Sequence, residues 1–134
     1  MAKKEILIVD DEKDLLLMLE KRLTAEGYSV LTADNGKDAI TIAKSKFPDL
    51  IILDVLMPGM DGGEVAEKLK DSPRTKNIPI IFLTALFTRK EEYEKNHIVA
   101  DNITFAKPFD PEELLDEIKT LVETAAIKTS PSYF

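Results

Sequence analysis

Side chains able to do phosphate chemistry stand where the apolar segments of this chain end. They are Asp10, Asp11, Asp54, Thr84 and Lys107. Carboxylates bind Mg²⁺, an ammonium binds phosphate oxygens, and an aspartate can act as a nucleophile toward phosphorus. If the fold brings these ends together, the sequence predicts a site that handles phosphate.

The segments that must position these residues read as five strands. Short apolar stretches rich in β-branched residues span residues 6–9, 28–33, 50–53, 78–83 and 103–106. Such runs are typical of strands that are covered on both faces. Apolar residues at helical spacing fall between and after them, around residues 15–23, 39–43, 65–69 and 114–122, and residues 88–97 favour a weak, mostly polar helix. Gly27 is expected just after the first helix, and Asp110 is expected to cap the last one.

Strands that alternate with helices indicate an α/β fold. The expected form is a doubly wound, five-stranded parallel sheet, (β/α)5, with helices on both faces and right-handed crossovers. In such a sheet the carboxyl ends of the strands meet at one edge, where ligands bind. We expect one domain over residues 1–123 and a C-terminal tail over residues 124–134.

Composition and charge exclude several classes of function. The net charge of −7 argues against direct nucleic-acid binding, which would need a basic face. The absence of cysteine excludes disulfides and thiolate metal sites. No segment approaches the length of a membrane span, and the apolar stretch after Lys3 and Lys4 is too short for a signal peptide. We therefore expect a cytoplasmic protein with no membrane partner.

Three clustered carboxylates have consequences of their own. They repel one another, and this repulsion raises at least one pKa unless a divalent cation relieves it. Mg²⁺ suits such a cluster because it prefers a few carboxylates, waters and a phosphate to a cage made entirely of protein ligands. Phosphoryl transfer in turn needs neutralisation of the three equatorial oxygens, which a cation, an ammonium, a hydroxyl and an amide would supply.

Taken together, these motifs resemble the receiver domain of two-component response regulators. The resemblance rests on Asp10-Asp11, Asp54, the loop 57–62, Thr84-Ala85 and Lys107-Pro108-Phe109, which occur in the order and spacing of that family. It covers roughly residues 4–123 and implies a flavodoxin-like strand order 2-1-3-4-5.

The resemblance also implies a role for each residue. Asp54 would accept a phosphoryl group from a phosphohistidine. Asp11, Asp54 and the backbone carbonyl of Leu56 would bind Mg²⁺, or Mn²⁺ in its place, with Asp10 acting mostly through water. Lys107, the Thr84 hydroxyl and the Ala85 amide would bind the phosphoryl oxygens. Such a protein is not an enzyme beyond catalysing its own phosphorylation and slow autodephosphorylation.

Two positions depart from the family pattern. Many receivers carry an aromatic switch residue three places before the lysine, together with the threonine that corresponds to Thr84. Thr104 holds the aromatic's place here, and Phe105 follows it. We expect Thr104 to occupy the switch position and Phe105 to share a face with Lys107. Leu56 stands where relatives can carry a polar residue that positions hydrolytic water, so a long-lived phosphoryl group is expected.

The resemblance implies partners and leaves alternatives open. A sensor histidine kinase or a histidine phosphotransfer protein would supply the phosphoryl group, and the output would be a downstream protein or a homodimer. The chain could be a stand-alone receiver, which Met1 and the Tyr133-Phe134 ending favour, or the receiver of a longer regulator with a DNA-binding or enzymatic output domain. A phosphatase of the haloacid dehalogenase type is disfavoured, because Leu56 replaces the general-acid aspartate of that family.

Overall fold

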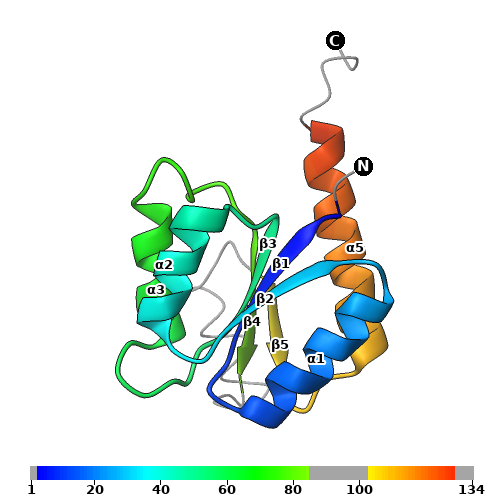
Figure 1. Cartoon of the computed structure of the whole chain (residues 1–134), viewed down its shortest axis with the longest axis horizontal. Coiled ribbons are helices and arrows are strands. Elements are labelled where there is room, and N and C mark those ends of the chain that lie inside the picture. The colour runs from blue at the N-terminus through cyan, green and yellow to red at the C-terminus, as the bar shows by residue number, and fades with distance from the viewer. Residues whose placement is uncertain (1–2, 85–102, 129–134) are drawn as a thin grey trace.

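The computed structural model describes residues 3–84 and 103–128, which form a single parallel sheet with helices on both faces (Figure 1). The strands are β1 (Glu5–Val9), β2 (Ser29–Ala33), β3 (Leu50–Asp54), β4 (Ile80–Thr84) and β5 (Ile103–Ala106). Their order is β2-β1-β3-β4-β5, and every neighbouring pair is parallel. The predicted fold class and strand order are confirmed.

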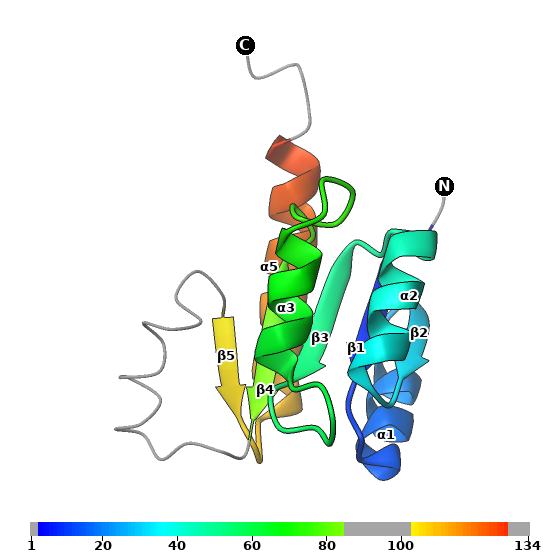
Figure 2. The ribbon, with the colours of Figure 1, turned by 90° about the vertical axis from the view of Figure 1, so that its left-hand side faces the viewer.

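Four described helices cover the two faces of the sheet. They are α1 (Lys13–Ala25), α2 (Gly36–Lys46), α3 (Gly62–Lys70) and α5 (Pro111–Lys128). Helices α2 and α3 lie on one side, and α1 and α5 lie on the other (Figures 1 and 2). None of the described helices has the length and apolar character needed to cross a membrane.

The strands alternate their side chains between two apolar layers, which is why both faces are covered. Leu7 and Val9 belong to the layer under α2 and α3, whereas Ile6 and Ile8 belong to the layer under α1 and α5. All four side chains are fully buried. Because both faces of β1 are buried, side chains pointing to either face must be apolar, which accounts for the continuous apolar run before Asp10.

Local sequence signals fix the helix ends. The Asn35 and Asp61 side chains accept hydrogen bonds from the third residue of α2 and α3, respectively. Gly27, with φ of 98°, follows α1 as predicted, and a side chain at that φ would be strained. The Asp110 carboxylate accepts from the Glu112 N–H at 2.9 Å, which confirms the expected cap of α5.

Three element boundaries differ from expectation. Strand β4 begins at Ile80, because the Ile78 N–H turns back to the Thr75 carbonyl instead of joining the sheet. Strand β2 begins at Ser29, because the Tyr28 N–H donates to the Leu23 carbonyl at the end of α1. Helix α5 continues to Lys128 and so includes the first five residues of the expected tail. The expected helix over residues 88–97 lies outside the described residues.

Candidate functional site

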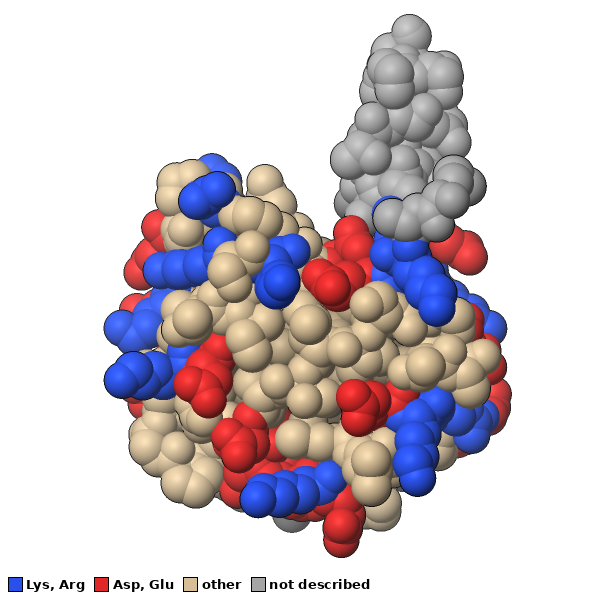
Figure 3. All heavy atoms as spheres, viewed as in Figure 1, with Lys and Arg blue, Asp and Glu red and all other residues tan. Residues whose placement is uncertain are grey.

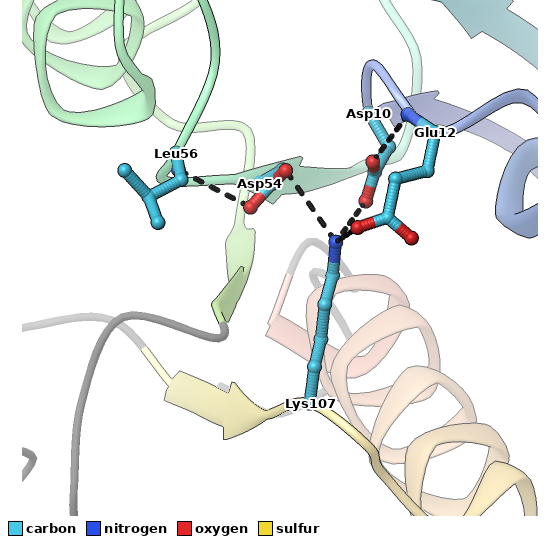
Figure 4. Close-up of polar contacts among 5 residues, drawn as sticks. All are labelled: Asp10, Glu12, Asp54, Leu56 and Lys107. Atoms are coloured by element: carbon cyan, nitrogen blue, oxygen red, sulfur yellow. Dashed lines mark hydrogen bonds and ion pairs between the residues drawn. The ribbon is translucent and has the colours of Figure 1, made fainter.

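The predicted chemical residues meet at one edge of the sheet. Asp10 directly follows β1, Asp54 ends β3, Thr84 ends β4 and Lys107 directly follows β5. Figure 4 shows the carboxylates of Asp10 and Asp54 pointing toward the ammonium of Lys107 from neighbouring strands. Because the strands are parallel, their carboxyl ends share this edge, as the sequence predicts.

Lys107 is the centre of a network of three carboxylates. Its Nζ lies 2.7 Å from Asp10 Oδ2, 3.3 Å from Glu12 Oε1 and 3.4 Å from Asp54 Oδ2. The Lys107 side chain is only 12% exposed, so little water competes for the ammonium. The backbone N–H of Lys107 donates to the Thr84 carbonyl at 2.8 Å, which ties β5 to β4 at the level of the site.

Both oxygens of Asp10 are engaged. Oδ2 accepts from Lys107, and Oδ1 accepts from the backbone N–H of Glu12 at 2.9 Å. The Asp10 side chain is fully buried, and a buried carboxylate needs partners of this kind. Asp10 therefore joins the start of α1 to the end of β5.

Among the carboxylates of residues 3–84 and 103–128, Asp54 has the pKa that departs most from its ordinary value. Burial and, to a lesser extent, the charge of Asp10 raise its pKa from 3.8 to about 6, although Lys107 and a hydrogen bond from the Leu56 N–H (3.2 Å to Oδ1) partly oppose the rise. Its side chain is 3% exposed. For Lys107, burial lowers the pKa, but the hydrogen bond to Asp10 and the surrounding carboxylates outweigh burial and hold it above its ordinary value. A carboxyl group with a strongly raised pKa beside a specific charged partner is typical of functional sites.

Three carboxylates at this edge have the spacing of a metal site. One oxygen each from Asp10, Asp11 and Asp54 lies within 4.8 Å of the other two. Asp10 and Asp54 are buried, whereas Asp11 is exposed and leaves the cluster open to solvent on one side. An all-oxygen, partly open donor set suits Mg²⁺, which keeps several waters. The residues present therefore fit the cation that the sequence suggests.

The expected switch residues lie on opposite faces of β5. The register pairs Thr104 with Phe82 and Phe105 with Leu83, so Thr104 shares the face of Thr84. Phe105 packs against the apolar layer under α1 and α5. The Thr104 hydroxyl is buried and has no hydrogen-bond partner among the described residues.

Two residues at the site were given no individual role by the sequence analysis. Glu12 contacts Lys107, and its only signal was that it extends the Asp10-Asp11 acidic run. Gly62 packs against the backbone of Asp54 and its N–H donates to the Val55 carbonyl at 3.0 Å. A sequence signal for this close packing of Gly62 was the presence of glycine at the first position of a helix, where most residues are tolerated.

Ala85, whose amide was expected to bind phosphate, lies outside the described residues. The Leu56 N–H donates to Asp54 Oδ1, and Leu56 is about half exposed. Figure 3 shows acidic side chains gathered along the lower edge of the molecule, where β4 ends in Figure 1.

Comparison with known proteins places this fold and site in one family. The family model for the response regulator receiver domain matches residues 6–119. A probable transcriptional regulator, ycf27, from Porphyra purpurea is 41% identical over 123 residues, which cover 92% of this chain and 49% of the relative. Response regulator PleD from Caulobacter vibrioides is 42% identical over 116 residues, 87% of this chain and 25% of PleD. The chain thus spans half or less of the length of these relatives.

Solved structures agree with the sequence comparisons. A putative response regulator from Chloroflexus aurantiacus superposes with a TM-score of 0.82 at 34% identity, covering 91% of this chain and 99% of that one. The chemotaxis protein CheY4 of Vibrio cholerae gives 0.79 at 32% identity, covering 90% and 99%. With the strand order and the carboxylate cluster already described, these matches show that the chain belongs to the receiver domain family of two-component response regulators.

Proposed function

We propose that Asp54 accepts a phosphoryl group from a phosphohistidine on a sensor kinase or a histidine phosphotransfer protein. The observation that carries this proposal is the meeting of Asp54 with Lys107 and two further aspartates at the ligand-binding edge of the sheet. Family membership makes the chain a signalling module, and the phosphorylated state is proposed to change its contacts with other proteins. Residues 1–123 would form the receiver proper, with α5 running on to Lys128.

The contacts of Asp54 support its proposed role as the nucleophile. The Leu56 N–H holds Oδ1 at 3.2 Å and Lys107 lies 3.4 Å from Oδ2, so the carboxylate has a fixed orientation. Transfer would form a bond between one Asp54 oxygen and phosphorus while the bond from phosphorus to the histidine nitrogen breaks. The histidine keeps the electron pair and, once protonated, leaves neutral. Fixing the attacking group in this way removes much of the orientational cost of the reaction.

A divalent cation fits among Asp10, Asp11 and Asp54. We propose Mg²⁺, with Mn²⁺ as a substitute, and the Leu56 carbonyl as a further ligand. The cation would supply charge neutralisation for the phosphoryl oxygens. It would also offset the repulsion between Asp10 and Asp54 that contributes to the raised pKa of Asp54.

Lys107, Thr84 and Ala85 are proposed to receive the phosphoryl oxygens. The Lys107 ammonium already lies beside Asp54, so a phosphoryl group there would take over one of its donors. The backbone bond between Lys107 and Thr84 keeps these two residues in register on neighbouring strands. The product is an acyl phosphate, which water cleaves slowly, and this reaction would end the signal without a separate enzyme.

The relatives suggest a second possibility for the whole protein. ycf27 is named a probable transcriptional regulator, and this chain aligns with 49% of its length. We therefore keep as an alternative that the chain is the receiver of a longer regulator with a DNA-binding or enzymatic output. In either case the receiver itself would act through protein contacts, with Thr84 and Thr104 on one face of the sheet as the route of the change.

The test is intact-mass spectrometry after incubation with Mg²⁺ and acetyl phosphate. We expect a labile increment of one phosphoryl group in the wild type, absent in Asp54→Asn and absent with EDTA. Asp110→Asn, which changes the cap of α5 and leaves the carboxylate cluster intact, should still be phosphorylated. A stable increment in Asp54→Asn would contradict the proposal, and so would the absence of an increment in the wild type with both acetyl phosphate and a phosphorylated histidine phosphotransfer domain.

A further inference from the structure

One of the three carboxylates around Lys107 has no part in the proposed chemistry. An ammonium has three N–H donors and accepts nothing. Asp10, Glu12 and Asp54 lie 2.7, 3.3 and 3.4 Å from Nζ, so these oxygens account for all of its donors (Figure 4). A phosphoryl oxygen can be bound by Lys107 only if one of them withdraws.

Glu12 is the carboxylate that can withdraw most easily. Its side chain is 62% exposed, whereas those of Asp10 and Asp54 are 0% and 3% exposed. Water can therefore replace Lys107 as the partner of Glu12, but not of Asp10, because a buried carboxylate without a partner is costly. The Glu12 backbone stays in place, since its N–H donates to Asp10 Oδ1.

The Glu12 side chain also interacts with Lys107 rather than with the helix that it precedes. Glu12 precedes the first residue of α1, yet its side chain makes no capping hydrogen bond with that helix. It lies instead against Lys107, at the rim of a hollow of about 400 Å³ that is otherwise lined by apolar side chains, among them Leu15, Met18 and Phe109. The hollow gives the carboxylate room to move aside.

We propose that Glu12 is a positioning residue that holds Lys107 in the unphosphorylated protein and slows phosphorylation of Asp54. This inference rests on the proposed function. An incoming phosphodonor is an anion, so it must both displace Glu12 from Lys107 and approach its negative charge. Glu12 would thus set how readily small phosphodonors charge the receiver, and would leave a kinase, which brings its own binding energy, at an advantage.

Two variants on the same turn of the chain separate this role from a general charge effect. Glu12→Gln and Asp14→Asn each remove one exposed negative charge near the start of α1, but only Glu12 contacts Lys107. The initial rate of phosphorylation by acetyl phosphate with Mg²⁺ is followed by intact mass. In this reaction the bond from phosphorus to an acetate oxygen breaks as the bond to Asp54 forms, and acetate leaves.

We expect Glu12→Gln to react about three to ten times faster than the wild type, and Asp14→Asn to stay within about twofold. Because the effect is electrostatic and partly exposed to solvent, the advantage of Glu12→Gln should shrink in about 0.5 M salt, where charges are screened within a few ångströms. A role in packing alone would not respond to salt in this way.

A double-mutant cycle tests the contact without any phosphorylation. Glu12→Gln, Lys107→Met and the double variant are unfolded by urea in EDTA, and the unfolding equilibrium constants are compared. We expect a coupling of about twofold to fivefold, the size typical of a partly exposed pair.

The outcomes are distinct. Faster reaction of Glu12→Gln with measurable coupling supports the inference. Equal rates for Glu12→Gln and Asp14→Asn, or no coupling, overturn it while wild-type phosphorylation leaves the proposed function intact. A wild type that no donor phosphorylates overturns both.

Discussion

A Cβ atom on Gly62 would lie 2.4 Å from the backbone carbonyl oxygen of Asp54. Real Cβ atoms do not approach other atoms so closely, and the obstacle is backbone rather than a flexible side chain. The first turn of α3 therefore packs directly against the end of the strand that carries the proposed nucleophile. Because of this close approach, only glycine fits at position 62 without displacing the backbone of Asp54.

Gly62→Ala is expected to damage both folding and phosphorylation. Overpacking of this kind costs about 1–3 kcal/mol of stability. Displacing Asp54 should lower its phosphorylation rate about tenfold or more, because misplacement of a nucleophile is costly. The control is Gly63→Ala, where the new Cβ would meet only the Asp61 side chain, at 3.2 Å. Urea unfolding and acetyl phosphate rates measure both effects, and equal behaviour of the two variants would contradict the expectation.

Asp54→Asn is expected to stabilise the protein in EDTA, increasingly so as the pH rises. Folding raises the pKa of Asp54 from 3.8 to about 6, so the folded protein binds a proton on the Asp54 carboxylate more tightly than the unfolded chain does. Wild-type stability should therefore fall between about pH 4 and pH 6 and then level off. Asp54→Asn cannot lose stability in this way. The difference in the free energy of unfolding between Asp54→Asn and the wild type should therefore reach roughly 3 kcal/mol at pH 7.

Denaturant unfolding at several pH values measures this difference. Asp116→Asn, which removes an exposed carboxylate on α5 far from the cluster in sequence, is measured in parallel as the control. Added Mg²⁺ should stabilise the wild type more than Asp54→Asn, because a ligand of the folded state raises stability. A difference between Asp54→Asn and wild type that stays constant from pH 4 to pH 7 would refute the argument.

Thr104→Val is expected to increase the stability of the unphosphorylated protein by roughly 1 kcal/mol. The Thr104 hydroxyl is buried without a partner among the described residues, and removing an unpaired polar group of this kind recovers its desolvation cost. Thr75→Val is the matched control, because the Thr75 hydroxyl donates to the Leu69 carbonyl at 2.7 Å. That variant should lose about 1 kcal/mol. Calorimetry would reveal whether the two changes have opposite signs.

Leu56→Asn is expected to shorten the lifetime of phosphorylated Asp54. Leucine offers no polar group to hold a water, and its side chain is exposed beside the proposed acceptor. An amide there could orient water toward phosphorus, and positioning of this kind contributes about tenfold or more to rate. Leu56→Met, which has no such group, is the control. Decay of the intact-mass increment after removal of the donor gives the rates, and identical decay in both variants would refute the idea.

The sequence was sufficient for the parts of the site that depend on topology. Alternating strands and helices require parallel strands, so Asp10, Asp54 and Lys107 had to reach one edge. The Glu12–Lys107 contact could not be read in this way, because a long exposed side chain has many rotamers and no periodicity selects one. The packing role of Gly62 could not be predicted for a related reason. Its distance from Asp54 depends on how α3 packs against the sheet.

The end of α5 shows the limit of reading apolar spacing alone. The stripe from Leu114 to Val122 suggested that the helix stops near residue 123. The structure continues it to Lys128, through Ala125 and Ala126, which are strong helix formers. The high helix propensity of these two alanines accounts for the continuation of α5 beyond Val122.

The carboxylate of Asp10 accepts hydrogen bonds from two residues at very different distances along the chain. Lys107 lies 97 residues after Asp10, and Glu12 lies two residues after it. Because one rigid, planar group carries both bonds, it cannot rotate toward one partner without loosening the other. A change in the hydrogen bond between Lys107 and Asp10 is thus expected to affect the position of the first turn of α1. A phosphoryl group on Asp54 that drew Lys107 away from Asp10 would therefore also alter the hydrogen bond between Asp10 and Glu12, which precedes α1.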